Sequence, residues 1–130
     1  MTEQGLAVVR RAFVAFNRWD VEGLLALCHH DIEWIPLRAP EGRVYRGHAG
    51  VRAALEELAQ EFEEVRNDPR DLRIAGEAVV VGGRLVAKYR GTGVRVDRSA
   101  GWVCHVREGR VVRMEVFPDG AAARRAAGAA

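Results

Sequence analysis

The sequence predicts an α+β fold in which three N-terminal helices pack on a strongly bent, mixed or antiparallel sheet. Apolar residues recur every three or four positions up to about residue 64, which is the period of a helix. From about residue 70 they recur at every second position, which is the period of a strand. Glycines divide this second half into strand-like runs, as expected for antiparallel strands joined by short turns. Helices gathered on one face of such a sheet form an α+β domain.

Length and composition limit the classes of protein to which the chain can belong. It has 130 residues, 48% hydrophobic and 29% charged, with a formal charge of +2. This fits one domain over residues 1–130, with an ordered core at about 4–120 and an alanine-rich tail at 121–130. The apolar content excludes a disordered chain, and no run approaches the roughly 20 apolar residues of a membrane span. The arginines are scattered among glutamates, so we expect neither a nucleic-acid nor a membrane partner.

The two cysteines indicate the redox environment. Cys28 and Cys104 each lie in an apolar run and match no metal-ligand spacing. We therefore expect both to be reduced thiols in the core. The first residues lack the apolar stretch and small-residue cleavage site of a secretion signal, and we expect a cytoplasmic protein.

Three helices are predicted, with one short strand pair among them, before the long antiparallel strands. Four apolar residues spaced by 3, 4 and 3 predict a helix over residues 3–18: Leu6, Val9, Phe13 and Phe16. Asp20 is predicted to cap a short second helix over residues 21–28, because its carboxylate can accept from free backbone N–H groups. A third helix is predicted after Gly47-His48. A row of glutamates is interpreted as its solvent face: Glu56, Glu57, Glu61, Glu63 and Glu64.

Turn residues mark the predicted strands. Residues 31–37 read as an edge strand that ends at Pro36, and Asn67-Asp68-Pro69 reads as the break before the sheet. Gly82-Gly83 and Glu108-Gly109 are predicted hairpin turns. After the last strand, Asp119 is expected to cap a final helical turn.

Three segments, taken in their order and spacing, resemble the nuclear transport factor 2-like superfamily and, within it, the SnoaL-like group. They are the aromatic first helix with Asp20 and its leucine-rich second helix, Tyr45-x-Gly47-His48 opening the third helix, and Gly109-Arg110-Val111-Val112 leading into Phe117-x-Asp119 and an alanine-rich end. The resemblance covers about residues 4–128. It implies a cone-shaped fold whose bent sheet wraps around the helices, a deep and mostly apolar pocket, and a homodimer formed through the outer face of the sheet.

The catalytic residues of two enzyme branches of this superfamily are missing at the matching positions. Ketosteroid isomerases place a carboxylate base before the proline that ends the first strand, and here that residue is Ile35. Their donor tyrosine in the first helix is replaced by Ala12. The Tyr-x-Asn pair of epoxide hydrolases falls on Ile32 and Trp34, and their Arg-x-Asp motif keeps Arg84 but lacks the aspartate. Polyketide cyclase chemistry demands less of the side chains and stays open.

Five residues remain as candidates for a catalytic role: Tyr45, Tyr89, Arg84, His105 and Glu115. Strand alternation puts the last three on the outer face, although a one-residue bulge would reverse this. The residues expected to bind a ligand are Phe16, Trp19, Trp34, Tyr45, Tyr89, Trp102 and Met114. Such a lining suits a small, mainly apolar molecule held by a few hydrogen bonds.

No metal or cofactor is expected. His29-His30-Asp31 is interpreted as a solvated helix end, because adjacent histidines on a helix point in different directions. Three functions stay open: an enzyme of isomerase, cyclase or hydrolase type, a non-catalytic binder of a small molecule, and a dimeric interaction module. A carboxylate that points into the pocket and whose pKa is raised by burial would favour the enzyme. A pocket whose only hydrogen-bonding groups are Tyr and Trp would favour the binder.

Overall fold

The structure is a computed structural model that describes residues 3–37 and 43–128. Its elements in chain order are α1 (Glu3–Asn17), α2 (Val21–Ala26), β1 (Cys28–Ile35), β2 (Tyr45–Arg46), α3 (Gly47–Glu61), β3 (Phe62–Ala75), β4 (Ala78–Tyr89), β5 (Arg95–Arg107), β6 (Arg110–Phe117) and α4 (Gly120–Ala126). The predicted α+β class with three N-terminal helices is confirmed. The alanine-rich end forms a fourth helix rather than a single turn.

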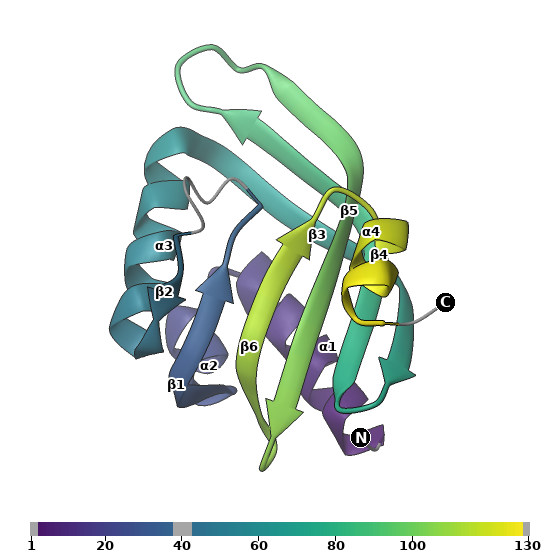
Figure 1. The fold of residues 1–130 in the computed structure, drawn as a ribbon. Helices are drawn as coiled ribbons and strands as arrows, with labels where there is room; N and C mark the ends of the chain where they lie inside the picture. The colour runs from purple at the N-terminus through teal and green to yellow at the C-terminus, as the bar shows by residue number, and fades with distance from the viewer. Residues whose placement is uncertain (1–2, 38–42, 129–130) are drawn as a thin grey trace.

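The six strands form one sheet in the order β2-β1-β6-β5-β4-β3. The pair β1–β6 is parallel and the other neighbours are antiparallel, so the sheet is mixed. Helix α1 crosses behind the sheet in Figure 1, whereas α4 lies in front of it over β4 and β5. The β4–β5 hairpin continues beyond the end of β6, because Arg95–Ala100 pair with β4 alone. The face of the sheet toward α1 is called the inner face here, and the face toward α4 the outer face (Figure 1).

The main core lies between the helices and this inner face. Its most deeply buried side chains come from both layers: Ile32, Val9, Val51, Val79 and Val81. Phe13 of α1 meets Trp102 of β5 edge to face, with 5.1 Å between the ring centroids. Both predicted caps are confirmed, since Asp20 accepts from the Gly23 N–H at 2.9 Å and Asp119 from the Ala122 N–H at 2.7 Å.

The prediction of a hairpin at Gly82-Gly83 is wrong, because both residues lie inside β4. The chain turns at Gly76 instead, which has φ +61°. The two glycines mark places where backbones approach each other. A Cβ on Gly83 would lie 2.0 Å from the carbonyl oxygen of Asp68 in β3. Gly82 pairs with Gly101 of β5, and α4 packs over both.

Other element boundaries also differ from prediction. Asn67-Asp68-Pro69 does not precede the sheet but lies inside β3, where a bulge between Pro69 and Asp71 accommodates it. His29-His30-Asp31 begins β1 rather than ending a helix. Glu63 and Glu64 belong to β3, where they pair with Lys88 at 3.2 Å and Arg95 at 3.6 Å.

Alternation predicts Val112, Met114 and Val116 on the inner face of β6, and for Val112 this is wrong because of a bulge. Pairing with β5 shifts register between His105 and Val106, so Val111 is buried in the core and Val112 lies on the outer face. Beyond the bulge the alternation is as predicted, and Met114 faces inward. Within the described ranges, no helix has the length and apolar character needed to cross a membrane.

Candidate functional site

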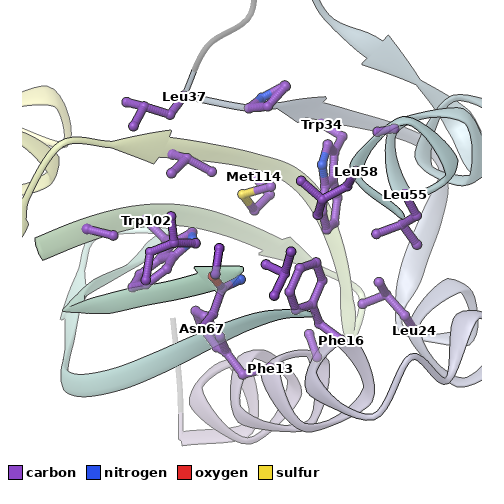
Figure 2. A pocket seen from close by; sticks show the side chains of 18 of the residues that line it. Phe13, Phe16, Leu24, Trp34, Leu37, Leu55, Leu58, Asn67, Trp102 and Met114 are labelled. Carbon is purple, nitrogen blue, oxygen red and sulfur yellow. The ribbon is translucent and has the colours of Figure 1, made fainter. Parts of the chain in front are cut away.

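A cavity of about 310 Å³ lies between the helices and the inner face of the sheet. Helices α1 and α3 form one wall, with Phe13 and Phe16 from the first and Leu55 and Leu58 from the second. Figure 2 shows these side chains pointing toward the same space as Met114 on the opposite side. The cavity arises because the bent sheet stands away from the helices instead of packing on them along its whole length.

Six of the seven residues expected to bind a ligand line this cavity: Phe16, Trp34, Tyr45, Tyr89, Trp102 and Met114. Trp19 does not. It lies in the turn between α1 and α2 with φ +53°, is 38% exposed, and stacks on Phe16 with 6.0 Å between centroids. The tight turn that leads into the Asp20 cap holds the Trp19 ring outside the cavity. We therefore withdraw Trp19 from the set of ligand-binding candidates.

Three of the catalytic candidates lie on the outer face of the sheet. Arg84 donates from Nε to Asp97 Oδ1 at 2.7 Å. Glu115 accepts from Arg113 Nη2 at 3.2 Å. His105 lines a second, polar pocket of about 390 Å³ on that face. None of the three lines the cavity. Simple alternation therefore gave the correct face for each.

The three residues considered as metal ligands lie near this outer pocket. One ligand atom of each of His29, His30 and Asp31 lies within 4.8 Å of the others. Their hydrogen-bonding atoms already contact one another. His29 Nδ1 accepts from the Asp31 N–H at 3.0 Å, and His30 Nε2 lies 3.2 Å from Asp31 Oδ2. The three side chains are outside the cavity.

The cavity rim carries a pair of side chains from β2 and α3. The Tyr45 hydroxyl donates to Glu57 Oε2, and this hydrogen bond raises the pKa of Tyr45 above its usual value. Arg43 lies on the other side of the pair, with Nη1 3.4 Å from Glu57 Oε1 and its guanidinium 4.4 Å from the centre of the Tyr45 ring. Glu57 and Glu61 both line the cavity, so the glutamate row of α3 is not wholly a solvent face.

Two polar residues that were not among the sequence candidates line the cavity itself. Asn67 of β3 is only 9% exposed, and Figure 2 shows its side-chain amide on the cavity wall. Arg98 of β5 also lines the cavity. Asn67 Oδ1 and Arg98 Nε are both buried and have no hydrogen-bond partner among the described residues. Such groups are costly in an apolar wall unless something satisfies them.

The two cysteines also line the cavity, one from β1 and one from β5. Burial raises the pKa of both Cys28 and Cys104 to about 12. The thiolate is the reactive form of cysteine, and at such a pKa very little of either thiol is ionised at neutral pH. Neither cysteine is therefore expected to act as a nucleophile. The lining can thus hold an apolar molecule and offer it an acceptor at Asn67 Oδ1 and a donor at Arg98 Nε, with carboxylates at the rim.

Comparison with known structures agrees with this architecture. TerC, co-crystallised with polyporic acid, superposes with a TM-score of 0.80 at 24% identity, over 97% of this chain and 99% of TerC. A nuclear transport factor 2-like protein of unknown function from Burkholderia pseudomallei K96243 gives 0.80 at 26% identity, over 96% and 97%. A proposed polyketide cyclase from Xanthomonas campestris pv. campestris gives 0.73 at 20% identity, over 88% and 90%.

Comparison by sequence identifies the family. No curated protein matches the chain significantly. The family model of the SnoaL-like domain matches residues 9–114, which is most of the chain and includes the strands and helices around the cavity. The chain therefore belongs to the SnoaL-like domain family of the nuclear transport factor 2-like superfamily.

Proposed function

We propose that this protein binds a flat, mainly apolar small molecule in the cavity. The observation that supports it is the combination of an apolar wall with few polar groups. The volume of about 310 Å³ is at the lower end of the range of roughly 300–1,000 Å³ for small-molecule sites. Trp34 and Trp102 supply rigid rings on which a planar molecule can stack. The names of two related structures, one with polyporic acid and one a proposed polyketide cyclase, also concern small organic molecules.

The positions of the carboxylates favour binding over catalysis as the first proposal. A general base must lie within hydrogen-bond reach of the proton that it removes. Glu115 lies on the outer face, and Glu57 is held at the rim by Tyr45 and Arg43. Glu61, the other carboxylate of the lining, is solvent-exposed at the end of α3. The polar groups that the sheet contributes to the cavity, Asn67 and Arg98, can orient a ligand and polarise its oxygen but do not act as a general base.

An enzyme of isomerase or cyclase type is the second candidate, and the pair of Tyr45 and Glu57 supports it. A tyrosine that donates to a carboxylate at a cavity mouth can exchange protons with the exposed end of a bound substrate. If the pair is catalytic, Tyr45→Phe will reduce turnover of a cyclising substrate while leaving its affinity within about twofold. A variant that keeps full turnover would exclude this role for Tyr45.

Binding is tested with N-phenyl-1-naphthylamine, an uncharged aromatic probe whose fluorescence rises in an apolar site. Trp34→Ala removes a wall of the cavity, and we expect it to weaken probe binding by about tenfold or more. Trp19→Ala is the matched control, because it removes the same kind of ring from outside the cavity. Urea unfolding of both variants separates binding from stability, and Trp34→Ala is expected to lower affinity more than stability. Equal affinity of the two variants would contradict the proposal.

We also propose that the protein is a homodimer joined through its outer sheet face. Helix α4 covers part of that face, where Ala123 packs with Ala78, Val80 and Val103. The area left for a partner is therefore the part of the sheet beside α4. Sedimentation equilibrium of the whole chain measures this directly, and a monomer at micromolar concentration would exclude the dimer.

A further inference from the structure

The two polar residues of the cavity lie in one row across the sheet. Asn67 of β3 pairs with Leu85 of β4, and Leu85 pairs in turn with Arg98 of β5. All three line the cavity, so their side chains project from the same face. Adjacent strands are about 4.8 Å apart, which places the Cα atoms of Asn67 and Arg98 about 10 Å apart. The combined reach of an arginine and an asparagine side chain is comparable with this separation.

The surroundings leave both groups without a partner. Asn67 Oδ1 and Arg98 Nε are buried and unpaired within residues 3–37 and 43–128, and the ion pairs of those residues do not include Arg98. The neighbouring rows of the inner face are apolar. The row on one side consists of Val65, Ala87 and Val96. On the other side, the next cavity-lining residue of β5 is Ala100. A buried Nε–H of Arg98 without an acceptor is costly beside apolar walls, and an anion that enters the cavity would accept from it.

The amide of Asn67 suits the same ligand group. Its backbone is held on both sides, because the Asn17 side chain bonds the Asn67 carbonyl oxygen at 2.8 Å and the Asn67 N–H at 2.9 Å. The side chain is therefore not needed to anchor the strand. The unpaired atom, Oδ1, is an acceptor, and a half-turn of the amide about its last bond would put the Nδ2 donors in its place, where an anion could accept from them.

We propose that Asn67 and Arg98 form an oxyanion-binding subsite, which takes the acidic oxygen of a flat apolar ligand: a carboxylate, or an ionised enol or phenol. This inference rests on the proposed small-molecule function and names the class of ligand. The apolar part of the ligand lies against Trp34, Trp102 and Met114, and its charged end accepts from Arg98 and Asn67.

The acidic residues of the cavity lie where they oppose this binding least. Glu57 and Glu61 also line the cavity, both from α3. The charge of Glu57 is offset by Arg43 at 3.4 Å and by the Tyr45 hydroxyl. Glu61 is solvent-exposed at the end of α3, where water screens its charge. Arg98 is therefore the cation available to an anion inside the cavity, within the part of the chain that the structure describes.

The test compares two fluorescent probes with the same ring skeleton. N-phenyl-1-naphthylamine is neutral, and 8-anilinonaphthalene-1-sulfonate adds one anionic group. We expect Arg98→Met to weaken sulfonate binding by about tenfold, because a charge-assisted hydrogen bond is lost. The same variant changes binding of the neutral probe by less than about twofold, because methionine retains the apolar stem. Asn67→Leu is expected to weaken sulfonate binding by a smaller factor, again with little change for the neutral probe.

Matched controls make each outcome decisive. Arg84→Met removes an arginine from the outer face of β4, where it pairs with Asp97, and should leave both probes unchanged. Binding of the neutral probe also shows that each variant is folded. If Arg98→Met weakens both probes equally, or if the wild type binds the neutral probe but not the sulfonate, the subsite is wrong while the proposed function stands. If the wild type binds neither probe, the proposed function itself fails.

Discussion

The side chain of Asn17 forms two hydrogen bonds with the backbone of Asn67. Asn17 Nδ2 donates to the Asn67 carbonyl oxygen at 2.8 Å, and Asn17 Oδ1 accepts from the Asn67 N–H at 2.9 Å. The amide thus takes the place of a neighbouring strand at the free edge of β3, which is the last strand of the sheet. It joins the end of α1 to the strand segment that carries a polar residue of the cavity.

We expect Asn17→Ala to lower the free energy of unfolding by about 2 kcal/mol, because it leaves two part-buried backbone groups of Asn67 without partners. Urea unfolding measures the change. Arg18→Ala is the control, since Arg18 is exposed on the next position and its removal is expected to cost less than about 0.5 kcal/mol. Equal stability of the two variants would show that the Asn17–Asn67 contact adds nothing.

The features that were predicted correctly depend on neighbouring residues in the sequence. The carboxylates of Asp20 and Asp119 each accept from the backbone N–H three residues ahead, in the first turn of the helix that follows, so a short segment determines each cap by itself. The turn at Glu108-Gly109 is also confirmed, because both residues take positive φ angles of 54° and 74°. Helix and strand periods likewise reflect which side of each segment is buried.

The errors arose where distant segments decide the structure. Gly82-Gly83 has the composition of a hairpin turn, but both residues lie inside a long strand, where the closeness of the Asp68 carbonyl requires glycine at position 83. The bulge before Asp71 lets β3 continue through a proline. Both features depend on segments that are distant in the sequence. Local composition therefore favoured a turn at each place.

The cavity wall was predicted better than its polar groups. Trp34, Trp102 and Met114 were placed on the inner face because each lies in an apolar alternation. Arg98 was missed although a signal existed: steps of two from Trp102 through Ala100 reach it on the same face. The signal for Asn67 was hidden, because Asn-Asp-Pro is typical of a turn.

Glu33 makes the free energy of unfolding depend on pH, and its two arginine partners determine the sign of this dependence. Its carboxylate accepts from Arg46 Nη1 at 2.5 Å and from Arg113 Nη1 at 2.8 Å, and is 29% exposed. The Arg46 hydrogen bond is the main cause that lowers the pKa of Glu33, with Arg113 adding to it. A lowered pKa contributes stability above the unfolded-state value of about 4.3, and this stability is lost as the pH falls through the folded-state value.

We therefore expect Glu33→Gln to destabilise the protein by about 1 kcal/mol at pH 7 and by progressively less below about pH 4. Urea unfolding of wild type and variant across this range measures the difference. Glu22→Gln is the control, because the Glu22 side chain is 76% exposed and pairs with Arg52 alone. A difference for Glu33→Gln that stays constant from pH 7 to pH 3 would contradict the assignment.

The raised pKa of the two thiols predicts low reactivity in the folded state. Burial holds the pKa of Cys28 and Cys104 at about 12, so the thiolate fraction at pH 8 is about 10⁻⁴. Mass spectrometry after treatment with iodoacetamide should find both thiols unmodified in the native protein and both modified in guanidinium chloride. Native alkylation of either thiol at the rate of free cysteine would show that it is accessible as a thiolate.

Gly101 should be intolerant of a side chain, because it underlies α4 on the outer face. A Cβ there would lie 2.2 Å from the Asp119 carbonyl oxygen and 2.9 Å from Ala123 Cβ, so α4 must move. That movement also opens the contact of Ala123 with Val103. We expect Gly101→Ala to lower the free energy of unfolding by about 1–3 kcal/mol, the range for overpacking in a well-packed site, as measured by urea unfolding.

Gly82→Ala is the matched control, since Gly82 faces Gly101 across the β4–β5 pair and its added Cβ would meet only the Gly120 Cα, at an ordinary 3.4 Å. It should therefore be close to neutral. The cavity lies on the opposite face, so the fraction of Gly101→Ala that stays folded should still bind N-phenyl-1-naphthylamine with wild-type affinity. If Gly101→Ala is as stable as Gly82→Ala, α4 does not pack on the sheet in solution. The Asp119 carbonyl would then be able to move away from the added methyl group.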